Sequence, residues 1–283
     1  MASWRRTPSA PRLQGGLMYA LEIRCRPADR ERLIAELWER GTLGILEVGP
    51  GLIAYFASES EALTAAQGLA AGSFRVSPVP ENDWAVRWRE GWRPFELGAK
   101  FFLAPEWDRE PAPSGRIRLS LRPGRACGTG LHPCTRLCLE LLEEHVTPGL
   151  VVVDVGTGSG LLAAAAALLG AGRTIACDLA DEAIAEARER FQREAPSVLL
   201  FQGSLRAVRP QTADLVLANI SAAAVVQLAP EIKRVAKPGG VAVLSGFPAR
   251  AQKTVLAALG TVGFRCRQAR ELEGWQALVC YTP

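Results

Sequence analysis

Three glycines at alternate positions after an apolar run constrain this chain more than any other feature. Residues 151–155 are valines with one aspartate, and Gly156, Gly158 and Gly160 follow at once. A short β-branched run is typical of a buried strand, and glycine is needed where the chain turns with a positive φ or where another group approaches the backbone. Residues 161–169, nearly all alanine and leucine, predict a buried helix. We therefore expect a strand that turns into a helix around a ligand bound by the three glycines.

Polar residues end the strands that follow. Residues 174–177 predict a second strand, and Asp178 at its tip can accept hydrogen bonds from both hydroxyls of a ribose. Residues 197–201 and 214–219 predict the third and fourth strands. Because ligands of open parallel sheets bind at the carboxyl ends of the strands, Asn219 should face the same crevice as Asp178 and the glycine loop.

Strands and helices continue to alternate toward the C-terminus. Residues 237–240 end a helix, residues 241–245 predict a strand, and the patterns around 263–264 and over 275–281 indicate two more strands. Such alternation is typical of a parallel sheet covered by helices on both faces. We therefore expect an α/β fold, with a Rossmann-like, doubly wound domain over residues 116–283.

The glycine loop fits two kinds of ligand. Gly158, Gly160 and Ala163 match the weaker pyrophosphate fingerprint, so a nicotinamide enzyme is one interpretation. A dinucleotide fold usually starts its glycines directly at the strand end, whereas here Asp154 precedes Gly156 by two residues. The acid followed by alternate glycines resembles instead the class I S-adenosylmethionine-dependent methyltransferases, in which the loop faces a methionine moiety. We favour the methyltransferase.

A segment upstream of the glycine loop is more specific. Residues 124–139 have the sequence GRACGTGLHPCTRLCL, which resembles the Phe-Gly-Thr-Gly-x-His-x-Thr-Thr segment of the ribosomal protein L11 methyltransferase (PrmA) family. Cys127 and Cys134 stand where that family has phenylalanine and the first of two threonines. The resemblance runs from about residue 81 to the C-terminus and includes residues 82–88, 103–107, 215–220 and 237–240. It implies S-adenosylmethionine as the methyl donor and ribosomal protein L11 as the substrate.

The resemblance also assigns the site residues. Four positions carry over as cofactor or active-site residues: Thr135, Gly156, Asp178 and Asn219. Gly158, Gly160 and Thr129 are also assigned to cofactor binding. At a helix start, a threonine lies beside exposed N–H groups that favour the methionine carboxylate. Ser204, after the third strand, is either an adenine contact or an ordinary capping serine.

Asn219 is the expected catalytic residue. The chain has two histidines, and neither is an obvious base: His132 lies in the motif with a functional or a structural role, and His145 lies at a solvated helix end. We expect Asn219 and nearby carbonyls to accept hydrogen bonds from the attacking nitrogen, while water takes the proton. Ile220 and Ser221 follow, where enzymes that methylate planar nitrogens tend to have Pro-Pro and an aromatic residue. This difference favours a flexible aliphatic amine, such as lysine or a protein N-terminus.

Residues 17–80 predict a small second domain. Strands are expected over 17–25, 43–48, 52–56 and 74–79, with helices over 29–40 and 59–70. This βαββαβ order is that of a ferredoxin-like α+β domain. The resemblance implies that this domain recognises the ribosomal protein.

Residues 81–115 are expected to form a linker helix and a connecting segment. Trp84, Trp88 and Trp92 recur there at four-residue spacing. Such a stripe either binds a base or a partner or forms a packing seam, and we favour the seam.

Charge and cysteine content limit the other functions. Residues 1–16 contain Arg5, Arg6 and Arg12 but no acid, so this tail, which we expect to be disordered, accounts for most of the formal net charge of +4. The remainder is nearly neutral, which predicts that no direct nucleic-acid contact is required. The tail has no apolar core long enough for a signal peptide, and no apolar run in the chain reaches the length of a membrane span. The seven cysteines lack zinc-type spacing, so we expect reduced thiols, no metal and a cytoplasmic location.

Two other functions fit the same fold. The chain could methylate lysines of another protein or a small molecule, or it could bind the cofactor without catalysis. The sequence gives no indication of the oligomeric state.

Overall fold

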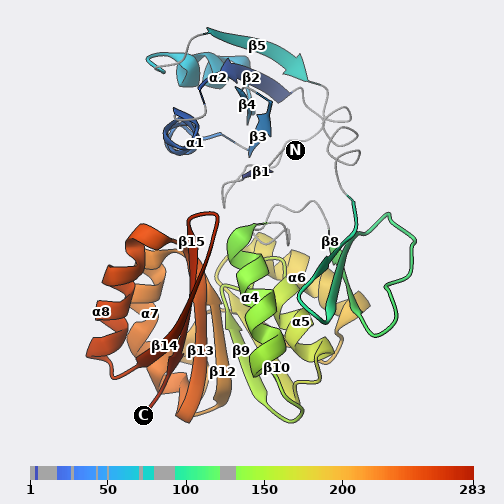
Figure 1. Cartoon of the computed structure of the whole chain (residues 1–283), viewed down its shortest axis with the longest axis vertical. Helices are drawn as coiled ribbons and strands as arrows, with labels where there is room; N and C mark the ends of the chain where they lie inside the picture. Colours follow the sequence, from blue (N-terminus) through green and yellow to red (C-terminus); the bar gives the residue numbers. More distant parts are fainter. Residues whose placement is uncertain are drawn as a thin grey trace. The chain divides into compact units, whose positions relative to one another are not determined.

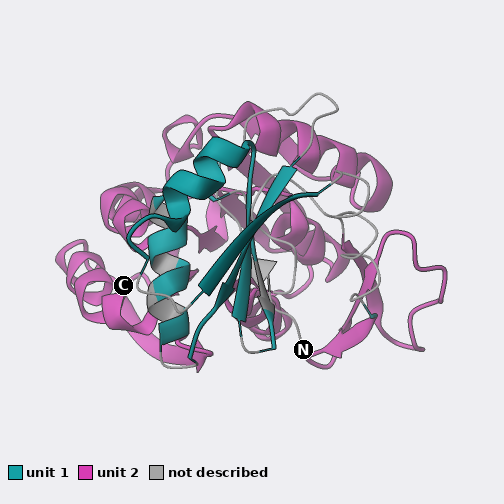
Figure 2. Ribbon diagram, turned by 90° about the horizontal axis from the view of Figure 1, so that it is seen from above, with its two compact units in different colours: residues 1–93 teal, residues 94–283 magenta. Residues whose placement is uncertain are grey.

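The computed structural model describes residues 4–5, 18–26, 29–42, 44–49, 51–69, 73–79, 93–121 and 132–283. The chain divides into two compact units, Met1–Arg93 and Pro94–Pro283 (Figure 1 and Figure 2). This division differs from the expected boundaries, because residues 94–115 fall in the second unit and not in a connecting segment. Among the described residues, no helix has the length and apolar character needed to cross a membrane.

The first unit is an antiparallel sheet with two helices. Its elements are β1 (Trp4–Arg5), β2 (Met18–Arg24), α1 (Arg30–Glu39), β3 (Gly44–Val48), β4 (Gly51–Phe56), α2 (Glu59–Ala66) and β5 (Ser73–Val79). The strand order is β1-β3-β4-β2-β5. From β2 to β5 the element order is the expected βαββαβ. Leu21 and Ile23 of β2 pack with Leu33 and Leu37 of α1 and with Phe56 of β4, so alternate strand residues and one helix face form the core.

Two residues of the expected disordered tail form a strand. Trp4 and Arg5 pair with Leu46 and Ile45 of β3. The backbone groups on the outer side of β3 would otherwise form an open edge, which explains why two tail residues can add to it. The other residues of 1–16 lie outside the described part of the chain, as do residues 81–92 with their three tryptophans and residues 124–131 of the family motif.

A small sheet begins the second unit. It consists of β6 (Phe95–Leu97), β7 (Phe101–Pro105) and β8 (Ile117–Leu121), with β7 in the middle. All five residues of β7 are buried, and this burial explains why a segment expected to be a connection is a strand. Glu143 ties the turn between β6 and β7 to the main domain, because its carboxylate accepts hydrogen bonds from the backbone N–H groups of Ala99 and Lys100.

The main sheet confirms the expected doubly wound α/β fold. Its strands are β9 (Val151–Val155), β10 (Arg173–Asp178), β11 (Leu199–Gln202), β12 (Ala213–Asn219), β13 (Ala236–Pro248), β14 (Arg265–Leu272) and β15 (Trp275–Tyr281). The order is β11-β10-β9-β12-β13-β15-β14. The first five strands of this order are parallel, and β15 is antiparallel to both of its neighbours.

Helices cover both faces of this sheet. They are α4 (Pro133–His145), α5 (Leu161–Leu168), α6 (Asp181–Glu194), α7 (Ala222–Val235) and α8 (Gln252–Thr261). Helices α4, α5 and α6 form one layer, and α7 and α8 form the other (Figure 1). Helix α8 was not predicted from the sequence. The central strands are buried from both sides, as residues such as Val153, Val216 and Val243 show by their lack of exposed surface.

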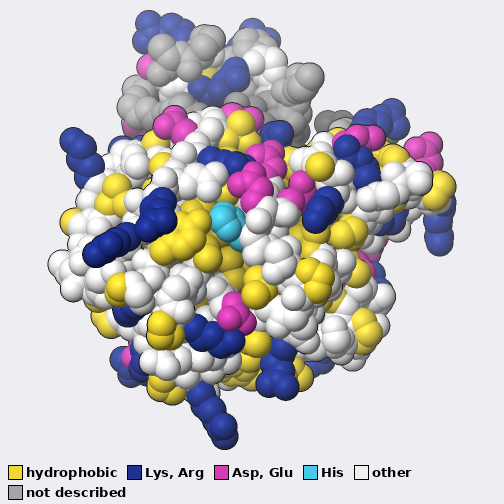
Figure 3. Space-filling model, turned by 60° about the horizontal axis from the view of Figure 1, so that its bottom comes forward, with side chains coloured by type: hydrophobic (Ala, Val, Ile, Leu, Met, Phe, Trp, Pro, Cys, Tyr) yellow, Lys and Arg dark blue, Asp and Glu magenta, His cyan; other side chains and the backbone are white. Residues whose placement is uncertain are grey.

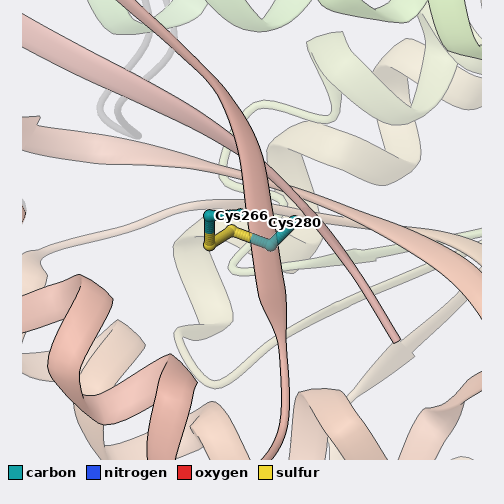
Figure 4. Close-up of a disulfide and its surroundings, with 2 residues drawn as sticks. All are labelled: Cys266 and Cys280. Atoms are coloured by element: carbon teal, nitrogen blue, oxygen red, sulfur yellow. A yellow bond between two sulfur atoms is a disulfide. The ribbon is translucent and has the colours of Figure 1, made fainter. Parts of the chain in front are cut away.

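The cysteines correct one expectation. Cys266 of β14 and Cys280 of β15 are direct cross-strand partners and are joined by a disulfide (Figure 4). The expectation of reduced thiols is therefore wrong for this pair, because the register of the two strands places their side chains together. Cys25, Cys134, Cys138 and Cys177 are free. Burial raises the pKa of the Cys134 and Cys138 thiols, so neither side chain is a ready thiolate.

Candidate functional site

The expected site residues end three adjacent parallel strands. Strand β9 lies between β10 and β12, with Asp154 opposite Ala176 on one side and Leu217 on the other. Because the strands are parallel, the glycine loop after β9, Asp178 and Asn219 lie at one edge of the sheet. The sheet therefore brings these residues together as the sequence predicted.

Asp178 holds the glycine loop in place. One carboxylate oxygen, Oδ2, accepts a hydrogen bond of 2.9 Å from the backbone N–H of Gly158, and Oδ1 accepts one of 3.1 Å from that of Ala180. Leu179, which directly follows Asp178 in the chain, has 73% of its surface exposed. The tip of β10 thus presents a partly exposed carboxylate beside an exposed apolar side chain. Leu179 is not among the site residues predicted from the sequence, although it directly follows Asp178.

Two glycines of the loop are required by packing within the protein. Gly156 has φ +68°, and a Cβ there would lie 2.5 Å from Cγ2 of Ile220. Gly160 has φ +78°, and a Cβ there would lie 2.8 Å from the ring of Phe191 on α6. We expected these glycines to let a ligand approach the backbone, but at both positions the space is taken by a protein side chain. Glycine at both positions therefore lets the loop pack against Ile220 and α6, and the expected contact of these glycines with the cofactor stays a prediction.

Asn219 and Thr135 are in contact. The Nδ2 group of Asn219 donates a hydrogen bond of 3.3 Å to Oγ1 of Thr135. Thr135 lies in the first turn of α4 and is 1% exposed, so its hydroxyl is directed at Asn219 and away from solvent. This contact turns the amide oxygen of Asn219 away from Thr135, where it can accept another hydrogen bond.

His132 has a structural role at the start of α4. It is the N-cap residue, and its Nδ1 accepts a hydrogen bond of 3.2 Å from the backbone N–H of Cys134. Its ring packs edge-on against Trp275 of β15, with 4.5 Å between the ring centroids. His145 is at the opposite end of the helix. His132 therefore makes the structural hydrogen bond that was one of its two expected roles. Its neighbour Trp275 was not predicted from the sequence.

Ser204 caps a short 3-10 helix, Leu205–Ala207. Its side chain accepts a hydrogen bond of 3.4 Å from the backbone N–H of Arg206. The capping interpretation of this serine thus has a contact to support it. Thr129, the remaining expected site residue, lies outside the described residues.

Asp154 is a buried acid that the sequence analysis noticed without assigning it to the site. It is 1% exposed, and its Oδ2 accepts a hydrogen bond of 2.6 Å from Oγ1 of Thr157 in the glycine loop. The pKa of its carboxyl is raised to about 7: burial is the largest cause, the Thr157 hydrogen bond opposes the shift, and the nearby charge of Asp178 adds to it. The carboxyl group that accepts the hydrogen bond from Thr157 of the glycine loop is therefore one with a strongly raised pKa.

Asp154→Asn is expected to gain stability relative to the wild-type chain as the pH rises. The pKa of Asp154 is higher in the folded chain than the value of about 3.9 in an unfolded chain. Between about pH 4 and 7 the folded chain therefore holds a proton that the unfolded chain has released, and the free energy of unfolding falls with rising pH. The neutral asparagine lacks this loss. Urea unfolding measures the free energy of unfolding of the variant minus that of the wild type, and this difference should rise by about 2 kcal/mol from pH 5 to pH 7. The same difference at both pH values would contradict the prediction.

Comparison with known proteins identifies the family. The model of the ribosomal protein L11 methyltransferase (PrmA) family matches residues 34–282. This chain belongs to the PrmA family. A ribosomal protein L11 methyltransferase from Symbiobacterium thermophilum is 38% identical over 205 residues, which are 72% of this chain and 67% of the relative. One from Desulforamulus reducens is 35% identical over 237 residues, which are 83% of this chain and 77% of the relative.

A solved structure supports the same assignment. The crystal structure of a ribosomal protein L11 methylase from Lactobacillus delbrueckii subsp. bulgaricus matches with a TM-score of 0.61 and 28% identity. The match covers 68% of this chain and 99% of that chain. As a member of the PrmA family, the chain is an S-adenosylmethionine-dependent protein methyltransferase.

The residues at the sheet edge fit the PrmA-family cofactor. Asp178 offers carboxylate oxygens to ribose hydroxyls, and the exposed Leu179 beside it offers an apolar surface to a purine. The glycine loop leads into α5, whose first N–H groups favour a carboxylate. A nucleoside joined to an amino acid needs these three kinds of surface.

Proposed function

We propose that this chain transfers methyl groups from S-adenosylmethionine to lysine side chains and the N-terminal amine of ribosomal protein L11. The observation that carries the proposal is the contact between Asn219 and Thr135 beside the glycine loop, in a chain of the PrmA family. When bound, S-adenosylmethionine supplies a methyl group that its sulfonium centre already activates. The residues of the chain then need to bind the cofactor, orient the attacking amine and exclude water from the site.

The binding role falls to the ends of β9 and β10. Asp178 would accept hydrogen bonds from the ribose, and Leu179 would pack against the base. The glycine loop and the start of α5 would hold the methionine end. Because Asp178 also accepts the N–H of Gly158, one carboxylate would fix both the loop and the ribose.

The orienting role falls to Asn219. With its amide nitrogen engaged by Thr135, the amide oxygen can accept an N–H of the attacking amine and direct the nitrogen lone pair toward the methyl group. The attacking amine must be neutral, so its ammonium form first gives a proton to water. As the nitrogen–methyl bond forms, the methyl–sulfur bond breaks and the sulfonium becomes a neutral thioether. The Nδ1 atom of His132 already accepts the N–H of Cys134, which supports a mechanism without this histidine as the base.

We assign recognition of L11 to the first unit. A hollow on its sheet is lined by charged residues, Glu22, Arg24 and Arg75, and by the exposed apolar residues Val48 and Phe74. A mixed surface of this kind suits a folded protein. Basic and acidic side chains are interspersed on the one face that Figure 3 draws. The nearly neutral charge of the chain outside residues 1–16 supports a mechanism that requires no direct nucleic-acid contact. A ribosomal protein substrate also supports a cytoplasmic location.

Asp178→Asn is expected to weaken binding of S-adenosylmethionine by about 10- to 100-fold. The substitution removes a charged acceptor, and hydrogen bonds to charged groups contribute about 1.5 to 3 kcal/mol. Isothermal titration calorimetry measures the change in Kd. Asp181→Asn, which alters an exposed acid at the start of α6, should leave Kd within about twofold. Unchanged binding by Asp178→Asn would remove this residue from the site.

The substrate is tested by mass spectrometry of L11. Free L11 incubated with the chain and S-adenosylmethionine should gain mass in steps of one methyl group, and peptide masses should place the methyl groups on lysines and the N-terminus. Cofactor binding without methylation of L11 would discard this substrate. Methylation of another protein or a small molecule would then indicate a methyltransferase with a different substrate, and no transfer at all would indicate a binding module.

A further inference from the structure

A buried arginine on α6 contacts the glycine loop. Arg190 is 4% exposed. Its Nε donates a hydrogen bond of 2.8 Å to the backbone carbonyl of Ser159, and its Nη1 donates one of 2.8 Å to the backbone carbonyl of Ser120. The same Nη1 lies 3.1 Å from Oε2 of Glu194, one turn along the helix. One guanidinium therefore holds two carbonyls and one carboxylate inside the protein.

One of the two carbonyls belongs to the glycine loop, and the other belongs to β8. Ser159 lies between Gly158 and Gly160, and the carboxylate of Asp178 accepts a hydrogen bond from the N–H of Gly158. Ser120 lies in β8, the last described strand before the family motif at residues 124–139. Arg190 thus connects the loop assigned to the cofactor with β8.

Stability alone is a weak reason for this charge to be buried. Replacing a buried ion pair with apolar residues of similar size is often neutral or stabilising, because removing two charges from water is costly. The planar guanidinium, in contrast, can donate in several fixed directions at once, which a lysine ammonium or an apolar side chain cannot do. The contacts of Arg190 use this property, since they fix backbone positions on two separate segments.

We propose that Arg190 is a positioning residue for S-adenosylmethionine, which it does not touch. It holds the carbonyl of Ser159 at a fixed position relative to β8, and so keeps the glycine loop in its binding conformation before the cofactor arrives. This inference depends on the proposed assignment of the glycine loop to the cofactor.

Arg190→Met tests this role, because methionine keeps much of the apolar stem and removes all three contacts. We expect both Kd and KM for S-adenosylmethionine to rise about tenfold, while kcat at saturating cofactor and KM for L11 stay within about twofold. The matched control is Arg116→Met. Arg116 also donates to two backbone carbonyls, those of Gly98 and Phe101, and pairs with Glu96, but none of these partners belongs to the glycine loop. Its loss should leave Kd for the cofactor within about twofold.

The measurements are made below the unfolding temperature of every variant, which circular dichroism determines. An unchanged Kd in Arg190→Met would overturn the inference, and so would an equal rise in Arg116→Met, since that would indicate general destabilisation. If Arg190→Met does not fold, Arg190→Lys replaces it: the charge beside Glu194 remains, the bridge between the carbonyls is lost, and Kd should still rise. Normal binding by Asp178→Asn would instead refute the site, whereas weak binding by Asp178→Asn with normal binding by Arg190→Met refutes this inference alone.

Discussion

Asn219→Ala should lower kcat for methylation of L11 by about 100-fold or more, with a much smaller effect on the Kd of S-adenosylmethionine. The amide of Asn219 is oriented by Thr135, and alanine removes the acceptor that we expect to align the amine. A misaligned lone pair affects the transfer step and not the binding of the cofactor. Initial rates at saturating S-adenosylmethionine, followed by the mass of L11, measure the effect.

Substitutions of Thr135 provide the matched controls. Thr135→Ser keeps a hydroxyl for the Nδ2 group of Asn219 and should retain most of the activity. Thr135→Val keeps the shape, removes the acceptor and should give an intermediate loss, because the amide is then free to rotate. Wild-type turnover in Asn219→Ala would show that this residue does not orient the amine.

Gly246→Ala should lower the free energy of unfolding by about 3 kcal/mol or more. Gly246 lies in β13, where the register with β15 shifts, and has φ +95°. A Cβ there would overlap the backbone of Ile220, with its nitrogen 2.6 Å away and its carbonyl oxygen closer still. Backbone atoms cannot move aside as a flexible side chain can, and Ile220 directly follows Asn219. The substitution should therefore reduce both stability and activity.

Gly260→Ala is the matched control for this effect. Gly260 lies in α8, and a Cβ there would meet no atom within 4 Å. Alanine in a helix is favoured over glycine, so this variant should gain about 0.5 to 1 kcal/mol. Urea unfolding of both variants gives the two values. A loss below about 1 kcal/mol for Gly246→Ala would show that the strand accommodates the methyl group.

The main sheet was predicted well because the sequence features that indicate its strands each lie within a few residues. A β-branched run, three alternate glycines and an acid after the next strand each lie within a few residues, and β9, β10 and β12 appear where expected. The small sheet was missed, since β7 pairs with β6 on one side and with β8, a later strand, on the other, and this second pairing leaves no local pattern in the sequence. The disulfide was missed for a similar reason: Cys266 and Cys280 become neighbours only through the register of β14 and β15.

The site was predictable in its members but not in its contacts. Sequence order indicated that Asp178 and Asn219 end neighbouring strands, and no local pattern could show that Asn219 meets Thr135. Arg190 is the clearest case. It lies in the helix DEAIAEARERFQRE, among so many charges that it resembles a solvated residue, and only the packing of α6 against the glycine loop buries it.

The contact between Asn219 and Thr135 joins residues that are 84 positions apart. Contacts of such long sequence separation are costly in loop entropy and tend to form after local structure. The groups assigned to the chemistry are therefore brought together only when α4 has docked on the completed strands. Recovery of methyl transfer during refolding would report the assembly of the whole second unit, whereas helix content would return earlier.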